Sequence, residues 1–348
     1  MYFWVFRFFP KSAFSRLMGW MASRQAPRPL LTLVIRVYVL AFGIDMRQFQ
    51  KPTGGFSTFN EFFTRPLVPG ARPIAKGKTE LACPVDGHVS QAGPITAGQL
   101  IQAKGLKYSV EELLGGDESW KKYEGGQFVT IYLSPKDYHR IHTPIACDVT
   151  RFAYIPGELW TVSPAGVRGV PRLFSRNERV VSFLDTDIGE MALVKVGATV
   201  VGSVRVVYHS VTTNKSGAKA QRETLAKPHP LAKGEELGRF ELGSTVILLF
   251  QPGQAELVPL QPDQPLQLGE VIAHTVEAKT TKKASEKAPA KAAKKAPVKA
   301  AKAALAKVTK KASEKVPAKA AKKAPAKSTK KVPTKTSTKV AKKAPAKG

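Results

Sequence analysis

The chain has 348 residues and a net charge of +29, with 55 Lys and Arg against 26 Asp and Glu. Its two cysteines, Cys83 and Cys147, lie far apart without paired spacing, which argues against a disulfide framework or a zinc knuckle and favours a reducing compartment. The chain opens with aromatic residues rather than a basic region, and no small-residue cleavage site follows an apolar run. We therefore predict no cleavable secretory signal and a cytoplasmic working side.

The first 45 residues mix aromatic and aliphatic side chains with arginines, as around Arg7 and Arg16. Residues 30–44 are apolar apart from Thr32 and a central Arg36. Such a run is too short to cross a hydrocarbon core, which needs roughly 20 residues. We expect residues 1–50 to form amphipathic helices that lie in the lipid head-group region. The alternative is that these helices only cap the folded body.

From Phe56 onward, short runs of alternating apolar residues are separated by Gly, Pro and Asp, a pattern that predicts strands. Brief helical periodicity appears only at 59–63 and 110–114, and the polar segment 213–233 is expected to be a mobile loop. The strand spacing favours a sandwich or barrel, so the predicted class is α+β with a β-rich core. The expected strands are 128–133, 149–154, 180–184, 191–196, 199–208, 245–250 and 271–276.

The segment 278–348 has a different composition from the rest of the chain. It contains 24 Lys, no Arg and two acids, which gives it +22 of the total charge of +29. The motif AKKAP recurs at Ala293, Ala321 and Ala341. Lys, Ala and Pro bury too little surface to offset chain entropy, so we predict a disordered Lys/Ala/Pro-rich tail. The tail could bind an anionic lipid surface or nucleic acid, or have no specific partner.

Three short motifs carry residues that could perform chemistry. PVDGHV contains Asp86, SPKDYHRIH contains His139 and His142, and ELGSTVILLF contains Ser244. Each motif alone is weak, because Asp-Gly and Gly-Ser-Thr are common turn sequences. Together they supply a hydroxyl at Ser244, a base at His142 or His139, and an acid at Asp86 to orient the imidazole.

A serine that follows a glycine can attack its own backbone. The Ser244 oxygen would add to the unshielded Gly243 carbonyl and convert the peptide bond into an ester. A base that removes the Ser244 α-proton would then expel the ester as a carboxylate. The resulting dehydroalanine hydrolyses to a pyruvoyl group and ammonia, and the chain is cut between Gly243 and Ser244.

From about residue 56 to 276 the chain resembles the bacterial-type, pyruvoyl-dependent phosphatidylserine decarboxylases. The matching segments include FNEFFTRPL, PVDG, LSPKDYHRIHTP, PGELW, VGATVVGS and GRFELGST, and the combination of LGST with DYHRIH is specific to the family. The resemblance implies that Ser244 becomes the pyruvoyl cofactor and that Asp86 and His142 assist self-cleavage. It places His139 by the substrate carboxylate, as our candidate for reprotonating the α-carbon.

The resemblance also implies a domain at 51–277 that converts phosphatidylserine to phosphatidylethanolamine and carbon dioxide. The enzyme would act as a peripheral protein on the cytoplasmic face of the cell membrane, with its two cleavage fragments still associated, and whether it forms a homodimer stays open. A pyruvoyl ketone can condense with the serine amine and accept electrons as carbon dioxide leaves. Candidates for holding the lipid phosphate are Arg65, Lys136, Arg140 and Arg176.

Two other classes of function fit parts of the sequence. Asp86, His139 and His142 could be the ligands of a metal-dependent hydrolase, but the His-x-x-His spacing differs from the usual zinc-peptidase helix, and we expect no metal. A basic nucleic-acid-binding protein would explain the tail, but it leaves LGST and DYHRIH without a role. His88 has no role that the sequence supports.

Overall fold

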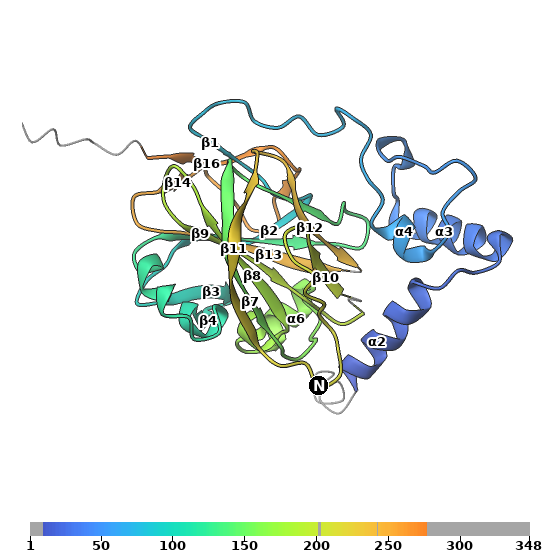
Figure 1. Cartoon of the computed structure of the whole chain (residues 1–348), viewed down its shortest axis with the longest axis horizontal. Coiled ribbons are helices and arrows are strands. Elements are labelled where there is room, and N and C mark those ends of the chain that lie inside the picture. Colours follow the sequence, from blue (N-terminus) through green and yellow to red (C-terminus); the bar gives the residue numbers. More distant parts are fainter. Residues whose placement is uncertain (1–9, 201–202, 242, 277–348) are drawn as a thin grey trace, which may run out of the picture. The chain divides into compact units, whose positions relative to one another are not determined.

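The computed structural model describes residues 10–200, 203–241 and 243–276 (Figure 1). All of these described residues belong to one compact unit. The tail at 278–348, predicted from its composition to be disordered, lies outside the described residues, as do the first nine residues.

An eight-stranded antiparallel sheet forms the centre of the unit. Along β13, Val246 and Leu248 face one apolar cluster while Ile247 and Leu249 face another, so both faces of the sheet are buried. The order is β11 (Gln221–Leu231), β7 (Cys147–Ile155), β8 (Arg179–Asp185), β9 (Met191–Val196), β13 (Ser244–Phe250), β5 (Gln127–Leu133), β2 (Gly87–Pro94) and β15 (Pro265–Leu266).

Two small sheets contribute Ile272 and Phe240 to the cluster on one face of the large sheet. They are β1 (Glu80–Ala82), β16 (Val271–Thr275) and β14 (Ala255–Leu257), and β10 (Ser203–Val206), β12 (Glu236–Glu241) and β6 (Arg140–His142).

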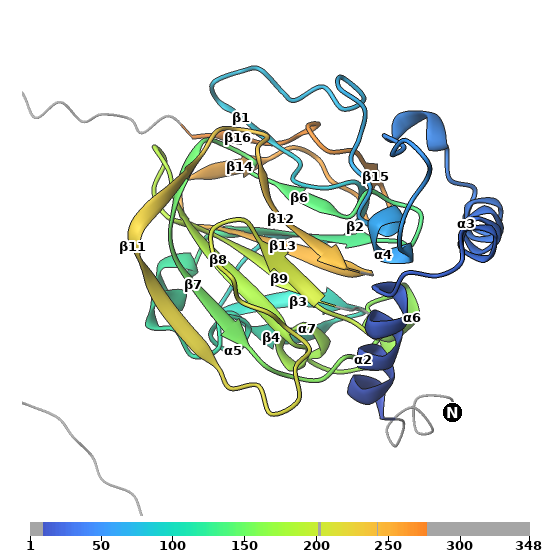
Figure 2. The same cartoon turned by 45° about the vertical axis from the view of Figure 1, so that its right-hand side comes forward.

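The other face packs against Tyr108 and Phe174, from a hairpin and short helices (Figure 2). These elements are β3 (Gln99–Ala103), β4 (Leu106–Ser109), α5 (Val110–Leu113), the 3-10 helix Glu118–Tyr123, α6 (Pro164–Gly169) and α7 (Leu173–Arg176). A second 3-10 helix, Met46–Gln48, belongs to the N-terminal region. The mixed α+β class with a β-rich core is confirmed.

The N-terminal region forms α2 (Lys11–Ala22), α3 (Arg28–Phe42) and the short α4 (Phe59–Phe63). Helix α2 is attached to the body where the Val200 backbone N–H donates to the Ser15 hydroxyl at 2.9 Å. Helix α3 packs on α4 through the Tyr38 ring, which lies edge-on to Phe62. Within the described part of the chain, every helix is too short or too polar to cross a bilayer.

Two predicted segments differ from the structure. The mobile loop expected at 213–233 is wrong for 221–231, because these residues form β11 and pair with β7. Strand β11 lies at a sheet edge with mostly exposed side chains, so it lacks the apolar alternation that marks a half-buried strand. The strand expected at 199–208 is limited to Ser203–Val206, because Val200 adopts a left-handed φ of 72° in a turn.

Candidate active site

Ser244 is the first residue of β13, an interior strand held between β5 and β9. Its side chain is only 1% exposed, and its hydroxyl has no hydrogen-bond partner among the residues that the structure describes. The preceding Gly243 has a φ of +47°, a left-handed conformation that glycine adopts without the steric cost of a Cβ. A buried hydroxyl without a partner is costly. The Thr245 hydroxyl shares this property, so what distinguishes Ser244 is its position after Gly243 in the lining of a cavity.

Pairing between strands brings His139 to the same end of the sheet as Ser244. Ser244 is in register with Leu133 of β5. On the other side of the turn between β12 and β13, the Phe240 N–H donates to the His139 carbonyl at 2.9 Å. Phe240 before the turn thus pairs with His139, and Ser244 after the turn pairs with Leu133, which holds His139 near Ser244.

His139 is fully buried, and its ring packs on Phe63 with centroids 4.1 Å apart. Its Nδ1–H donates to the Asp137 carbonyl at 2.7 Å, because a carbonyl can only accept. Burial lowers the His139 pKa to about 3, although the bond to Asp137 acts in the opposite direction, and the Arg65 charge lowers it further. The imidazole is therefore neutral, and within the described part of the chain the lone pair on Nε2 has no hydrogen-bond partner.

His142 has partners at both ring nitrogens. Nδ1–H donates to the Gly234 carbonyl at 2.8 Å, and the Tyr138 hydroxyl donates to Nε2 at 3.0 Å. Burial lowers the pKa of His142, while the Gly234 bond and the negative charges of Glu236 and Asp86 act to raise it. Nε2 is the ring nitrogen of His142 that can accept a proton, and the Tyr138 hydroxyl occupies it. A proton would therefore reach Nε2 through the Tyr138 hydroxyl.

Asp86 does not hydrogen-bond either imidazole, contrary to the expectation that it orients one. It forms a buried ion pair with Arg72 at 2.7 Å and accepts from the Leu268 N–H at 2.8 Å. The orienting groups are instead the backbone carbonyls of Asp137 and Gly234. Sequence reasoning missed these carbonyls because backbone acceptors leave no residue-type signal.

The described residues contain no cluster of three His, Cys, Asp or Glu side chains able to hold a metal ion. Three of the four ring nitrogens of His139 and His142 are engaged by protein groups. The geometry therefore does not favour these two histidines and Asp86 as a ligand set for a hydrolase.

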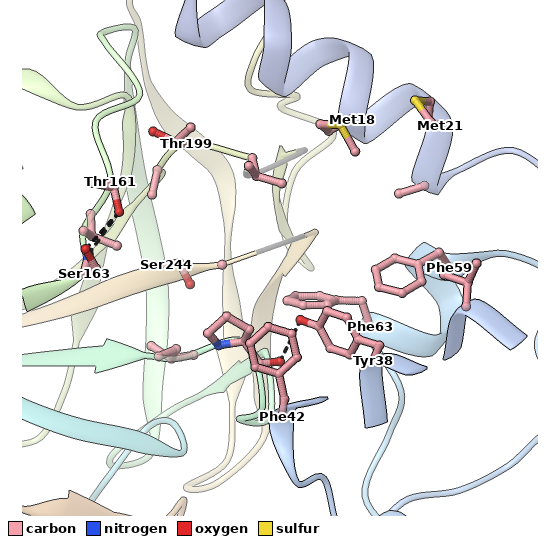
Figure 3. A pocket seen from close by; sticks show the side chains of 18 of the residues that line it. Met18, Met21, Tyr38, Phe42, Phe59, Phe63, Thr161, Ser163, Thr199 and Ser244 are labelled. Atoms are coloured by element: carbon pink, nitrogen blue, oxygen red, sulfur yellow. Dashed lines mark hydrogen bonds between the residues drawn. The ribbon is translucent and has the colours of Figure 1, made fainter. Parts of the chain in front are cut away.

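Ser244 opens into a cavity of about 650 Å³ (Figure 3). One wall is the sheet end with Gly243 and Ser244, and another comes from the three N-terminal helices. The apolar wall was not predicted as part of the site, although the aromatic spacing in FNEFF was a signal for it. Its aromatic residues are Tyr38, Phe42, Phe59 and Phe63.

The four cationic residues considered for lipid phosphate are absent from the cavity lining. Arg65 is buried, with its guanidinium 4.0 Å from the centre of the Phe49 ring. Arg140 and Arg176 form ion pairs with Glu236 and Glu158. Lys136 is exposed.

Comparison with known proteins identifies the family. Residues 59–274 match the family model for phosphatidylserine decarboxylase. This chain belongs to the phosphatidylserine decarboxylase family. It is 47% identical over 269 residues to a phosphatidylserine decarboxylase proenzyme from Anaeromyxobacter sp. (strain K), covering 76% of this chain and 95% of the relative. The proenzyme of the same name from Brevibacillus brevis is 46% identical over 278 residues, covering 79% of this chain and 95% of the relative.

The proenzyme from Myxococcus xanthus, also a phosphatidylserine decarboxylase, is 46% identical over 243 residues. That match covers 70% of this chain and 86% of the relative. Membership of the family makes the chain a carboxy-lyase and confirms the resemblance drawn from the LGST and DYHRIH segments. The matched region 59–274 contains every candidate site residue and ends before the Lys-rich tail.

Proposed function

We propose that this chain is a proenzyme that cuts itself between Gly243 and Ser244 and then decarboxylates phosphatidylserine to phosphatidylethanolamine. The observation that carries the proposal is the unpartnered, buried Ser244 hydroxyl, which follows a left-handed Gly243 and opens into a largely apolar cavity. A lipid with a reactive head and apolar chains has the chemistry that such a cavity accepts.

Self-cleavage begins with attack of the Ser244 oxygen on the Gly243 carbonyl carbon. The bond to the Ser244 nitrogen breaks, and the chain is then joined by an ester. Removal of the Ser244 α-proton expels the Gly243 carboxylate, and hydrolysis of the residue left behind yields the pyruvoyl group with release of ammonia. These steps need a proton acceptor, and the described site offers two neutral imidazoles, His139 and His142.

His142 and Asp86 are proposed to assist self-cleavage. Proton transfer to His142 would pass through Tyr138, whose hydroxyl donates to the imidazole Nε2. The negative charge of Asp86 favours proton uptake, because it raises the His142 pKa against the effect of burial. Asp86 is held in place for this by Arg72, with which it forms three hydrogen bonds of 2.7–3.2 Å.

The site also fits a pyruvoyl group at residue 244, because His139 Nε2 is a buried acceptor that lacks a protein partner. The pyruvoyl carbonyl would supply a centre that condenses with the substrate amine and accepts the electron pair released with carbon dioxide. His139 cannot begin as the acid, because its only ring proton is held by Asp137. We infer that Nε2 first takes a proton from the substrate ammonium and later returns it to the α-carbon.

We further propose that the enzyme works as a peripheral protein on the cytoplasmic face of the membrane. Helices α2 and α3 carry large apolar side chains that are exposed, a feature that favours contact with a lipid surface. They also form the apolar wall of the cavity, so docking would place the cavity beside the lipid. The exposed apolar residues are Leu17, Trp20, Met21, Leu30, Leu33, Val34, Val37, Leu40 and Phe42.

Replacing Ser244 tests the proposal directly. Ser244→Ala lacks the attacking oxygen, so it should remain a single chain of full mass and release no carbon dioxide from phosphatidylserine. The wild-type protein should give two fragments, and the smaller should be reducible by borohydride in the presence of an amine. Ser210→Ala removes an exposed hydroxyl and serves as the control. An active wild-type enzyme that is one uncut chain would refute the proposal.

A further inference from the structure

The cavity lining contains a pair of hydroxyls, Thr161 and Ser163, and the Ser163 hydroxyl donates to no other described residue. Thr161 donates to the Ser163 hydroxyl oxygen at 3.1 Å, so the Ser163 hydrogen is left for another acceptor. Two other lining hydroxyls are committed, since Tyr38 donates to the Pro135 carbonyl and Thr199 donates to the Leu159 carbonyl. The Ser244 hydroxyl is the group that the proposed function consumes. Figure 3 shows Thr161 and Ser163 beside the Ser244 end of the cavity.

A second, smaller hollow of about 180 Å³ adjoins this end. Tyr132 and Val162 line both cavities and therefore form the wall between them. The smaller hollow is also lined by His88, Lys104 and Arg168.

Among the described residues, none of these three basic side chains lies within ion-pair distance of a carboxylate. Asp263 lines the same hollow, but its single negative charge is outweighed by the two positive charges of Lys104 and Arg168. The wall between the cavities is thus backed by net positive charge, which favours an anion on the Ser163 side.

We propose that Ser163, backed by Arg168 and Lys104, binds the phosphodiester of the lipid head group. The inference rests on the proposed function. Only a few covalent bonds separate the amine of phosphatidylserine from its phosphorus. When the amine reaches residue 244, the phosphate must therefore lie close by, where the lining offers the Ser163 donor. The acyl chains then extend along the apolar wall formed by α2, α3 and α4.

Binding of non-reactive lipids tests this assignment without requiring turnover. The probes are short-chain phosphatidylglycerol, which has the phosphodiester but no amine, and a diacylglycerol with the same chains and no phosphate. Calorimetry should show that Ser163→Ala weakens phosphatidylglycerol binding by about tenfold, the range expected for a hydrogen bond to a charged group. Diacylglycerol binding should not change. Ser175→Ala, whose hydroxyl bonds Glu112 outside both cavities, should match the wild type.

Arg168→Gln should weaken phosphatidylglycerol binding a few-fold at low salt and have little effect at high salt, because its charge is exposed. The control is Arg172→Gln, which removes an exposed arginine that is paired with Glu112. Equal binding of the two lipids by the wild type would overturn the proposal, as would unchanged phosphatidylglycerol binding by Ser163→Ala. A wild type that binds phosphatidylglycerol through Ser163 but never releases carbon dioxide would refute the proposed function alone.

Discussion

The buried end of β13 and the exposed faces of α2 and α3 depart from ordinary protein surfaces in opposite ways. Ser244 and His139 are 1% and 0% exposed, yet each has a polar side-chain atom that no other described residue hydrogen-bonds. Leu33 and Leu40 are apolar, yet they are 58% and 81% exposed. Both arrangements cost free energy in the isolated protein. Under the proposed function, the two costs have one explanation: the buried region receives the lipid head group, and the exposed region contacts the apolar phase of the membrane.

The largest expected effect comes from the buried region. His139→Gln removes the free Nε2 lone pair and should lower the rate of carbon dioxide release by at least about 100-fold, the scale of general acid–base catalysis. Intact mass should be measured on the same sample, so that loss of self-cleavage is separated from loss of decarboxylation. His229→Gln on the edge strand β11 is the control. Full activity of His139→Gln in a cleaved enzyme would show that the buried lone pair is not used.

The burial of His139 also has a pH signature. Its folded pKa is about 3, below the ordinary histidine value of 6.5, so as the pH falls the unfolded chain binds a proton before the folded protein does. The associated stability is complete above pH 6.5 and is lost as pH falls toward 3. The melting temperature of the wild type should therefore fall more steeply below pH 6.5 than that of His139→Gln. Parallel curves would mean that His139 is not the buried neutral group described above.

An intermediate effect is expected from the exposed region. Leu33→Asp with Val37→Asp places two charges one turn apart on α3, at side chains that are 58% and 57% exposed. Liposome sedimentation should show binding at least about tenfold weaker, because charges resist transfer to the interface. Turnover of a soluble short-chain phosphatidylserine should be unchanged. Ile101→Asp on β3, where the side chain is 42% exposed, should bind liposomes like the wild type. Equal losses in the two variants would remove the special role of α3.

The smallest effect is expected from the Lys-rich tail. Truncation after residue 277 removes 24 lysines and should weaken binding to anionic liposomes a few-fold at low salt, with the difference disappearing at high salt. Self-cleavage should proceed as in the full chain. Unchanged binding at physiological salt would mean that α2 and α3 suffice for docking, and a gel-shift assay of both proteins would then show whether nucleic acid is the tail's partner.

The sequence predicted those helices and strands whose residue pattern alone determines their structure. The helix at Phe59–Phe63 and the strand at Met191–Val196 have the expected bounds, because FNEFF has helical spacing and MALVKV is a short, largely apolar strand run. Strands β2 and β12 were not predicted, since GHVSQAGP and ELGRFE contain glycines and polar residues at positions where an apolar alternation is expected. Their place depends on partners far away in the chain.

The candidate site also combines residues that the local sequence identifies with an arrangement that depends on distant partners. LGST and DYHRIH identified Ser244 and His139 by their family resemblance, but their placement at one end of the sheet depends on pairing with Leu133 and Phe240. Ser163 carries no signal in the sequence, because serine and threonine before a proline, as in TVSP, are common in loops. It becomes a candidate only when the cavity lining and the donor inventory are known.

The interior position of β13 has a consequence for the processed enzyme. Cleavage before Ser244 makes β13 the leading strand of a separate polypeptide, yet it remains inserted between β5 and β9 of the longer one. The mature protein is then a heterodimer that shares a single sheet, and its unfolding releases two molecules instead of one. Its thermal midpoint should therefore rise with protein concentration, whereas that of the uncut precursor should not. Maturation of this kind is one-way, because the nitrogen of the broken peptide bond leaves as ammonia, and a denatured sample must then recover its fold by a bimolecular encounter.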